Sequence, residues 1–407
     1  MTGKSRKGSV TVFLVIFFIS IAGCLQIFLY QSEKLAVKGS AESLGTVFAQ
    51  SLLAEYDVNL KERYGIFGLP GPESELNRKC AFYGKEAFRG KKKIHFENAS
   101  CIVSPYSLCN TELFRKQVIE ESSSAVFENI KEKAGEDEED SGESYDGRED
   151  PFIENMAVIY YLPSRGTESH PAKNSLGKTI LEKGSLKDAV SQAGEKGLVL
   201  AYIQHYFRNC SGKRNPGKTF FRNEQEYLVC GKFRDSKNRK TVRNRIVSIR
   251  EVVNYACLRK DEAKSAMVLS AAELLTPGPA AAATAEGLFS SWALAESIND
   301  YKLLLKGHRI PAVKTPDLWA VDLQSVINNE EQECIFTGTE RGEDYSDYMN
   351  LFLSVMDEHL LLLRMMDLIQ INMKYLYYDD FILKDCYGGL KVRFTVNGEE
   401  YETEKEY

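Results

Sequence analysis

An uncharged run of twenty-one residues near the start of the chain, Val10 to Tyr30, limits where the rest of the protein can be placed. As a helix that rises about 1.5 Å per residue, the run would be about 31 Å long, which matches the hydrocarbon core of a bilayer. Its polar side chains Thr11, Ser20 and Gln26 are too few to prevent insertion. We therefore predict a transmembrane helix over residues 10–30.

The charges on either side of this run predict its orientation. Lys4, Arg6 and Lys7 precede it together with the amino terminus, whereas the charges that follow it roughly cancel. By the positive-inside rule, residues 1–9 form a cytoplasmic stub and the rest of the chain lies outside the cell membrane. Apolar side chains along the helix are expected to anchor it. They are Val10, Phe13, Phe17, Ile21, Leu25 and Tyr30.

Two other interpretations of the start remain open. Ile21-Ala-Gly-Cys24 has the form of a lipobox, in which the cysteine is lipidated after cleavage, but the apolar run continues to Tyr30. Gly8 followed by Ser9 has the form of a pilin-type leader, in which a short basic segment is cut off before an apolar helix. Type IV pilins usually carry Glu at the fifth position after that cut, where this chain has Phe13.

The composition of the chain is typical of a folded exported protein. It is 43% hydrophobic and 27% charged with a net charge of −6, so it can form a core and gives no general case for nucleic acid. Eight of its nine cysteines follow the apolar run, and no CxxC pair or metal-ligand spacing is present. Buried free thiols are the favoured state, with disulfides Cys101–Cys109 or Cys210–Cys230 left open.

Changes in pattern along the chain predict its domains. Helical spacing without proline continues the membrane helix as an extracellular stalk over 31–64. A first exported α+β region is predicted over 65–133, ending in a helix from about Thr111 to Lys133. Residues 134–150 are rich in carboxylates and are predicted to be an acidic flexible linker, and residues 151–407 form the main exported domain.

The main exported domain is predicted to be mostly helical. Its apolar residues recur at helical spacing over four segments. These are 186–207, 241–257, 280–305 and 345–378. Residues 226–231 fit either a strand or a helix, and alternation around Asn397-Gly398 predicts a closing β-hairpin. The fold class is therefore α+β and mainly helical, with a transmembrane helix and stalk before the exported domain.

One catalytic motif matches in form. Gly212-Lys-Arg-Asn-Pro-Gly-Lys218-Thr219 fits the P-loop pattern, in which backbone N–H groups hold nucleotide phosphates. A P-loop needs a buried strand before it and a helix directly after it, and Phe220-Phe-Arg-Asn223 has no clear helical pattern. We therefore predict no nucleotide site, and no catalytic residue, cofactor or metal elsewhere in the chain.

A basic stretch from Ser211 to Arg250 is a candidate contact surface. It has twelve Lys or Arg residues against three acidic ones, with aromatic residues between them. Such a surface binds polyanions, including anionic polymers of a cell wall, although a solvated face beside a core helix has the same composition. The candidate contact residues are Lys213, Arg214, Lys218, Arg222, Lys232 and Arg234.

Several segments together carry a resemblance to a known group of proteins. They are Gly8–Leu14, Ser51–Asp57, Arg63–Phe67, Glu226–Lys232, Ile249–Asn254, Trp292–Ser297, Ile310–Thr315 and Arg364–Gln370 with Asn372. The set resembles a poorly characterised family of single-span exported proteins from Gram-positive anaerobes. Members are encoded near Tad (tight adherence, type IVb) pilus machinery and are similar at the N-terminus to TadE/TadG-like pseudopilins.

With no catalytic constellation in the sequence, the resemblance brings no assigned activity and no catalytic residues to this chain. It leads us to expect a membrane-anchored structural or assembly component of a Tad-like pilus or cell-envelope apparatus, with other pilus or envelope proteins as partners. The alternative is a membrane-anchored surface protein that binds polyanionic wall polymers through residues 211–250. No specific nucleic-acid partner is expected.

Overall fold

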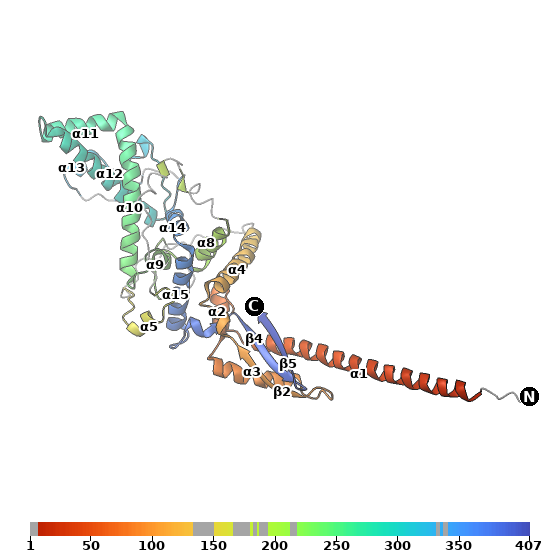
Figure 1. The fold of residues 1–407 in the computed structure, drawn as a ribbon. Coiled ribbons are helices and arrows are strands. Elements are labelled where there is room, and N and C mark those ends of the chain that lie inside the picture. Colours follow the sequence, from red (N-terminus) through yellow and green to blue (C-terminus); the bar gives the residue numbers. More distant parts are fainter. Residues whose placement is uncertain are drawn as a thin grey trace, which may run out of the picture. The chain divides into compact units, whose positions relative to one another are not determined.

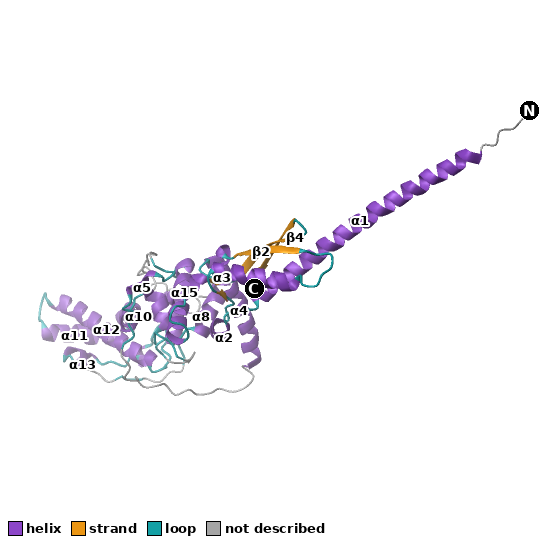
Figure 2. Cartoon of the chain, turned by 90° about the horizontal axis from the view of Figure 1, so that it is seen from below, coloured by secondary structure: helices purple, strands orange, loops and turns teal. Residues whose placement is uncertain are grey.

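The computed structural model describes residues 7–132, 150–165, 180–181, 185–186, 194–211, 218–330, 334–336 and 341–407. The chain divides into two compact units. Unit 1 comprises Met1–Val58, Phe67–Asn110 and Lys384–Tyr407, and unit 2 comprises Asn59–Ile66 and Thr111–Leu383. Helices dominate, and the strands are confined to a small antiparallel arrangement (Figures 1 and 2), which confirms the mainly helical α+β class.

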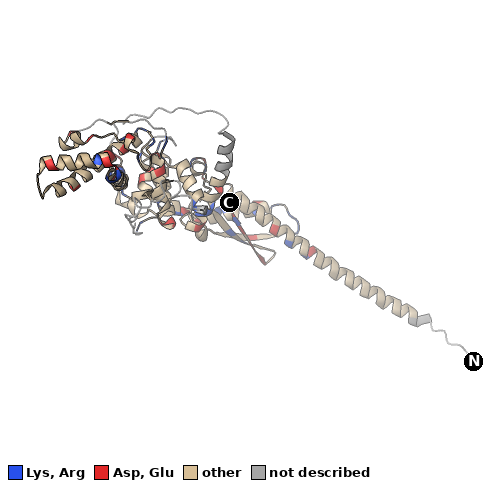
Figure 3. Cartoon of the chain, turned by 90° about the horizontal axis from the view of Figure 1, so that it is seen from above, with Lys and Arg blue, Asp and Glu red and all other residues tan. Residues whose placement is uncertain are grey.

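Unit 1 begins with the longest helix described, α1 (Lys7–Leu53). Its apolar first part carries no charge and is not buried against any other part of the chain (Figure 3). By length and composition it is a candidate membrane span or signal anchor. From Ala41 onward α1 is instead a core element, with Ala41, Phe48 and Leu52 all buried. The helix ends at Leu53, before the predicted end of the stalk at residue 64, and α2 (Val58–Tyr64) is separate.

The inner part of α1 packs on a three-stranded sheet. Its strands β2 (Phe96–Ile102), β4 (Gly389–Val396) and β5 (Glu399–Glu406) are antiparallel in the order β2-β4-β5. Phe48 of α1 meets Phe394 of β4 at a ring-centroid distance of 5.3 Å. Gly45 allows this close approach, because a Cβ there would lie 2.4 Å from the Phe394 ring. Helix α3 (Glu73–Ala87) also packs against β2.

The predicted hairpin is confirmed. Strands β4 and β5 pair in continuous register and are joined by Asn397 and Gly398, both with positive φ (52° and 75°), as a tight hairpin turn requires. A second, minimal pair of strands is formed by β1 (Leu69–Pro70) and β3 (Cys386–Tyr387). The chain therefore completes unit 1 only when its C-terminal segment returns to the sheet.

Unit 2 is helical. Its helices, in addition to α2, are α4 (Thr111–Glu132), α5 (Met156–Tyr160), α8 (Gly194–Tyr206), α9 (Glu224–Cys230), α10 (Asp235–Lys260), α11 (Glu262–Leu275), α12 (Ala281–Leu305), α13 (Leu323–Ile327), α14 (Tyr345–Ser354) and α15 (Glu358–Leu376). An apolar cluster joins α10 to α13, with Phe289 and Trp292 of α12 at its centre. The Trp292 indole N–H donates to the Val321 carbonyl oxygen at 2.7 Å and fixes the segment before α13.

Several predicted elements differ from the structure. The single helix expected over 345–378 is divided into α14 and α15, because Asp357 adopts an extended conformation and its side chain caps α15 by accepting from the Leu360 N–H. Residues 226–231, left open between strand and helix, lie in α9 and its C-terminal cap. Helix α4 belongs to unit 2, and the C-terminal strands belong to unit 1. Most of the predicted acidic linker, 134–150, lies outside the described residues.

Candidate functional site

The predicted anchor residues lie along the outer part of α1. Six residues are all exposed, with relative exposures from 38% to 67%: Val10, Phe13, Phe17, Ile21, Leu25 and Tyr30. The predicted processing residues Gly8 and Ser9 lie in the first turn of the same helix. This apolar surface can contact lipid or the helices of other proteins, since no other part of the described chain covers it.

The basic stretch does not form one continuous open surface. Lys213 and Arg214 lie outside the described residues, and Lys218 and Lys232 are exposed. Arg234 is engaged, because its guanidinium lies 4.4 Å from the centroid of the Phe152 ring and 3.6 Å from the Asp150 carboxylate. Arg222 is half-buried. Binding of wall polymers through this stretch stays a prediction.

The context of the P-loop pattern is not that of a nucleotide site. The helix α8 precedes it, and residues 218–223 form no helix directly after it. Thr219 is buried, and its hydroxyl donates to the Phe221 carbonyl oxygen at 2.7 Å, so it is directed back to its own loop. Of the motif, only Lys218 and Thr219 belong to the described residues.

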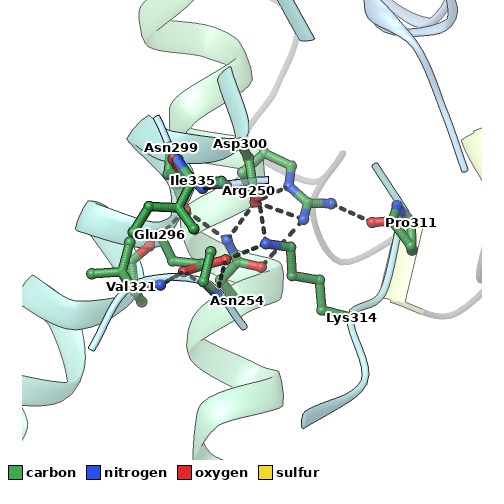
Figure 4. Close-up of polar contacts among 12 residues, drawn as sticks. Arg250, Asn254, Glu296, Asn299, Asp300, Pro311, Lys314, Val321 and Ile335 are labelled. Atoms are coloured by element: carbon green, nitrogen blue, oxygen red, sulfur yellow. Dashed lines mark hydrogen bonds and ion pairs between the residues drawn. The ribbon is translucent and has the colours of Figure 1, made fainter. Parts of the chain in front are cut away.

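The most elaborate polar arrangement in unit 2 is a buried group of four charged side chains (Figure 4). They are Arg250 of α10, Glu296 and Asp300 of α12, and Lys314 from the segment after α12. Their side chains are between 0% and 3% exposed. Two cations face two carboxylates, so the group is electrically balanced, as burial of charge in a protein core requires. We call these four residues the charged cluster.

Asp300 is the centre of the charged cluster. Its Oδ2 atom accepts from Nε and Nη2 of Arg250 at 2.9 and 2.7 Å and from Nδ2 of Asn254 at 3.0 Å. The Lys314 Nζ atom lies 2.6 Å from Oδ1 of Asp300 and also forms an ion pair with Glu296. Burial raises the pKa of Asp300, but the two cations outweigh it, and the net pKa lies below its usual value.

The remaining polar atoms of the charged cluster bind the chain that follows α12. Glu296 Oε2 accepts from the Val321 N–H at 2.8 Å. Nη1 of Arg250 donates to the carbonyl oxygens of Pro311 and Ala312 at 2.8 and 2.9 Å. The charged cluster therefore holds α10, α12 and the segment 311–321 together. Its charged groups bind one another and backbone groups.

A second buried polar group lies between α9 and α15. The Glu224 carboxylate accepts from the Asn372 side-chain amide at 2.7 Å and from the Arg208 N–H at 3.1 Å. The same Asn372 amide donates to the Tyr64 hydroxyl at 2.9 Å. Complete burial raises the pKa of Glu224 to about 7. This carboxyl therefore titrates near neutral pH inside the core.

Asp367 of α15 forms a third buried polar group. Its carboxylate accepts hydrogen bonds from the Ser164 N–H at 2.9 Å and from the Tyr227 hydroxyl at 2.8 Å, and it also bonds the Ser164 hydroxyl. Burial raises the pKa of Asp367 to about 6. The contacts fix the chain around Ser164 and helix α9 to the central helix of unit 2.

The arrangement of these three buried polar groups indicates a structural role. Each binds elements that are far apart in sequence through hydrogen bonds between buried groups. Among the described residues, no group of three or more His, Cys, Asp or Glu side chains could hold a metal ion. The nine cysteines are all free thiols, so neither Cys101–Cys109 nor Cys210–Cys230 is joined.

Sequence reasoning missed the charged cluster, although a signal was present. Arg250 and Asn254 are four residues apart on one helix, and Glu296 and Asp300 are four apart on another. Such spacing puts both members of a pair on one helical face, here the apolar face. Charged residues on the core-facing stripe of two helices indicate buried ion pairs, because a buried charge needs a partner.

Comparison with known proteins gives one family. The model of a family of unknown function (DUF5702) matches residues 161–398, which include the charged cluster and both other buried polar groups apart from Tyr64. No curated protein and no solved structure is detectably similar to the chain. The expected membership in an uncharacterised family is thereby supported at this level.

Proposed function

The chain belongs to the family of unknown function DUF5702, and we propose that it serves as a membrane-anchored structural or assembly component of a Tad-like pilus or related cell-envelope apparatus, without enzymatic activity. In this proposal the outer part of α1 is the membrane anchor, the N-terminus is cytoplasmic, and both units lie outside the cell membrane. The partners are other pilus or envelope proteins, which contact α1 within the bilayer or the two units outside it.

The observation that carries the proposal is the continuity of α1. One uninterrupted helix contains an exposed apolar part and, from Ala41, a part buried in the core of unit 1. A membrane helix on a flexible linker could only tether a domain. A rigid helix that is itself part of the domain core transmits position and force between the bilayer and that domain, as a component of an assembly must.

The charged cluster is consistent with a structural role. Its buried charges neutralise one another and bind backbone groups, so they hold α10 and α12 in one arrangement. Removal of one partner from such a group is strongly destabilising, which favours a single rigid conformation of this part of unit 2. Rigidity in the exported part supports a protein whose task is to contact partners.

The first test is the mass of the N-terminal peptide of the native protein from its membrane fraction. An uncut peptide that carries Lys4 to Lys7 supports a permanent anchor. A new start at Ser9 would show pilin-type processing and make incorporation into a filament the mechanism. A lipid on Cys24 would remove the membrane span and contradict the proposal.

The second test asks whether the exposed face of α1 contacts other proteins. A photo-reactive amino acid at Phe17, which is exposed, should cross-link the chain to other membrane or pilus proteins in intact cells. The matched control is the same label at Phe48 on the same helix, which is 1% exposed and should give only links within the chain. If the label at Phe17, like the control label at Phe48, gave no link to another protein, an assembly role would be contradicted.

A further inference from the structure

Two loops of unit 1 are attached to α1 just beyond its apolar run. Lys93, in the loop between α3 and β2, lies with Nζ 2.8 Å from the carboxylate of Glu33. Lys34 forms an ion pair of the same length with Glu399, which directly follows the β4–β5 turn. The α3–β2 loop lies beside α1 in both views of the chain (Figures 1 and 2). Both loops therefore meet α1 at neighbouring residues.

The two loops are also bonded to each other. The Asn397 side chain accepts from the His95 N–H at 2.8 Å and donates to the Lys93 carbonyl oxygen at 3.0 Å. The Asn397 N–H donates to the His95 carbonyl oxygen at 3.0 Å, and the Gly398 N–H donates to Glu97 at 2.6 Å. These bonds combine the α3–β2 loop and the β4–β5 turn into one structure, which we call the platform.

The platform lies at the depth of lipid headgroups if α1 spans the bilayer. Glu33 is three residues beyond Tyr30, the last residue of the apolar run, which corresponds to a rise of about 4.5 Å along the helix. The headgroup layer on each side of a bilayer is roughly 5–7 Å thick, from the difference between total and hydrocarbon thickness. The contacts of Lys93 and Lys34 with their partners thus fall within that layer.

The α3–β2 loop presents positive charge at this depth. Its sequence Arg89-Gly-Lys-Lys-Lys93 has four cations within five residues, and this basic loop lies next to α1 (Figure 3). Neighbouring carboxylates are already engaged, since Glu33 pairs with Lys93, and Glu86 pairs with Arg89. Lys91 and Lys92 are exposed, and neither has an ion-pair partner among the described residues. Their ammonium groups are the available cations of the platform.

We propose that the platform binds anionic phospholipid headgroups through Lys91 and Lys92. The proposal rests on the proposed function, because it requires α1 to span the membrane. An ammonium group near an anionic bilayer surface gains about 1 kcal/mol, and this gain decreases with added salt. The contact would fix the tilt and rotation of unit 1 on the membrane, because α1 and the platform would then hold it at two separate points.

Hydrogen exchange of the full chain tests the proposal in nanodiscs of two compositions. One set contains phosphatidylcholine alone, and the other contains phosphatidylcholine with phosphatidylglycerol. We expect the amides of residues 88–95 to exchange about fivefold more slowly per contacting lysine in the anionic discs, the fold-change that corresponds to about 1 kcal/mol. High salt should remove the difference.

A double variant supplies the decisive comparison. Lys91→Gln with Lys92→Gln should exchange equally fast in both discs. The control removes two exposed cations of unit 1 outside the loop, Arg78→Gln with Lys384→Gln, and should keep the difference. Equal exchange of the unaltered loop in both discs, or an undiminished difference in the double variant, would overturn the proposal.

The same data separate this proposal from the proposed function. If α1 spans the bilayer, the amides of residues 10–30 exchange slowly in both discs. Slow exchange there combined with equal exchange of residues 88–95 would overturn only lipid binding by the platform. Fast exchange of residues 10–30 in both discs would remove the membrane span itself and with it both proposals.

Discussion

The Arg250 guanidinium donates two hydrogen bonds to one carboxylate oxygen, Oδ2 of Asp300, from Nε at 2.9 Å and from Nη2 at 2.7 Å. The two residues are fifty positions apart in the sequence and come from α10 and α12. Both are almost completely buried. In this setting the energetic value of the pair lies mainly in the penalty for breaking it, because the remaining charge would be buried without a partner.

We predict that Asp300→Asn lowers the free energy of unfolding of unit 2 by about 3–5 kcal/mol. The substitution keeps the size of the side chain but removes the charge that pairs with Arg250 and, together with Glu296, with Lys314. Chemical denaturation of the detergent-solubilised full chain, followed by circular dichroism, measures the change.

The same two helices offer a matched control for Asp300→Asn. Arg259 of α10 and Glu286 of α12 form an ion pair at 2.8 Å, but their side chains are 46% and 54% exposed. Glu286→Gln should therefore cost no more than about 1 kcal/mol. If the two substitutions lowered the free energy of unfolding equally, burial would not determine how much the charged cluster stabilises unit 2.

The stability of unit 2 should decrease as the pH rises from about 4.5 to about 7. Burial raises the pKa of Glu224 from 4.5 to about 7, so the folded protein keeps a proton that the unfolded chain releases within this range. Stability falls with pH wherever the folded state binds more protons than the unfolded state. Thermal unfolding midpoints recorded across the range measure the slope, and Glu224→Gln should reduce it.

Asp261 provides a control for this pH dependence. Its carboxyl is half-buried at the start of α11, and the hydrogen bond with Lys264 lowers its pKa below 3.8. A carboxyl whose pKa is lowered on folding stabilises the fold at pH values above its pKa in the unfolded chain. That stabilisation is lost only as the pH falls below about 3.8. Asp261→Asn should thus leave the slope between pH 4.5 and 7 unchanged. If the unfolding midpoint of Glu224→Gln changed with pH as steeply as that of the unaltered chain, the pH dependence would not come from Glu224.

Elements fixed by local pattern could be predicted from the sequence. The uncharged run gave the outer part of α1, and Asn397-Gly398 between alternating residues gave the β4–β5 hairpin, because each depends on neighbours along the chain. The break before α15 was missed. Apolar residues continue on both sides of Asp357, so only its capping bond to Leu360 reveals that one helix ends and another begins.

The pairing within the buried polar groups could not be predicted, because the partners are distant in sequence. Arg250 ends the basic stretch, whose composition also fits a solvated face, yet its side chain is buried and pairs with Asp300. The platform was missed for the same reason. Lys93 and Glu33 are sixty residues apart, and only the packing of α3 and β2 against α1 brings them together.

Cys80 and Cys101 should form a disulfide under mild oxidation. Their buried thiols, on α3 and β2, are close enough to shift each other's pKa, which rises for Cys80 and falls for Cys101. Asn77, one helical turn before Cys80, accepts from the Cys101 N–H at 2.8 Å and fixes the two elements in this register. With an added disulfide reagent as oxidant, the two thiols lose two protons and two electrons, and the reagent is reduced to two thiols.

Peptide mass spectrometry after alkylation of the oxidised full chain identifies the pair. A linked peptide that contains Cys80 and Cys101 is the expected product, and Cys101→Ser should abolish it without linking Cys80 elsewhere. A Cys101–Cys109 or Cys210–Cys230 link as the main product would contradict the prediction, since Cys230 instead contacts the Asn238 carbonyl oxygen.

Gly231 is predicted to be required at the end of α9. Its φ of 64° is left-handed, a conformation that costs a residue with a Cβ about 1–2 kcal/mol. A Cβ would also lie 2.7 Å from Nη2 of Arg364, whose Nη1 donates to the Leu228 carbonyl oxygen at 2.7 Å. Gly231→Ala should therefore lower the thermal unfolding midpoint of the full chain through backbone strain and through displacement of the guanidinium.

Gly287 is the matched position for this substitution. It lies within α12, and a Cβ there would meet no atom within 4 Å. Gly287→Ala should stabilise the helix by roughly 0.5–1 kcal/mol, because alanine loses less backbone freedom on folding. The two alanine variants should thus shift the unfolding midpoint in opposite directions. If Gly231→Ala also raised the midpoint, neither the left-handed conformation nor the closeness to Arg364 would require glycine at this position.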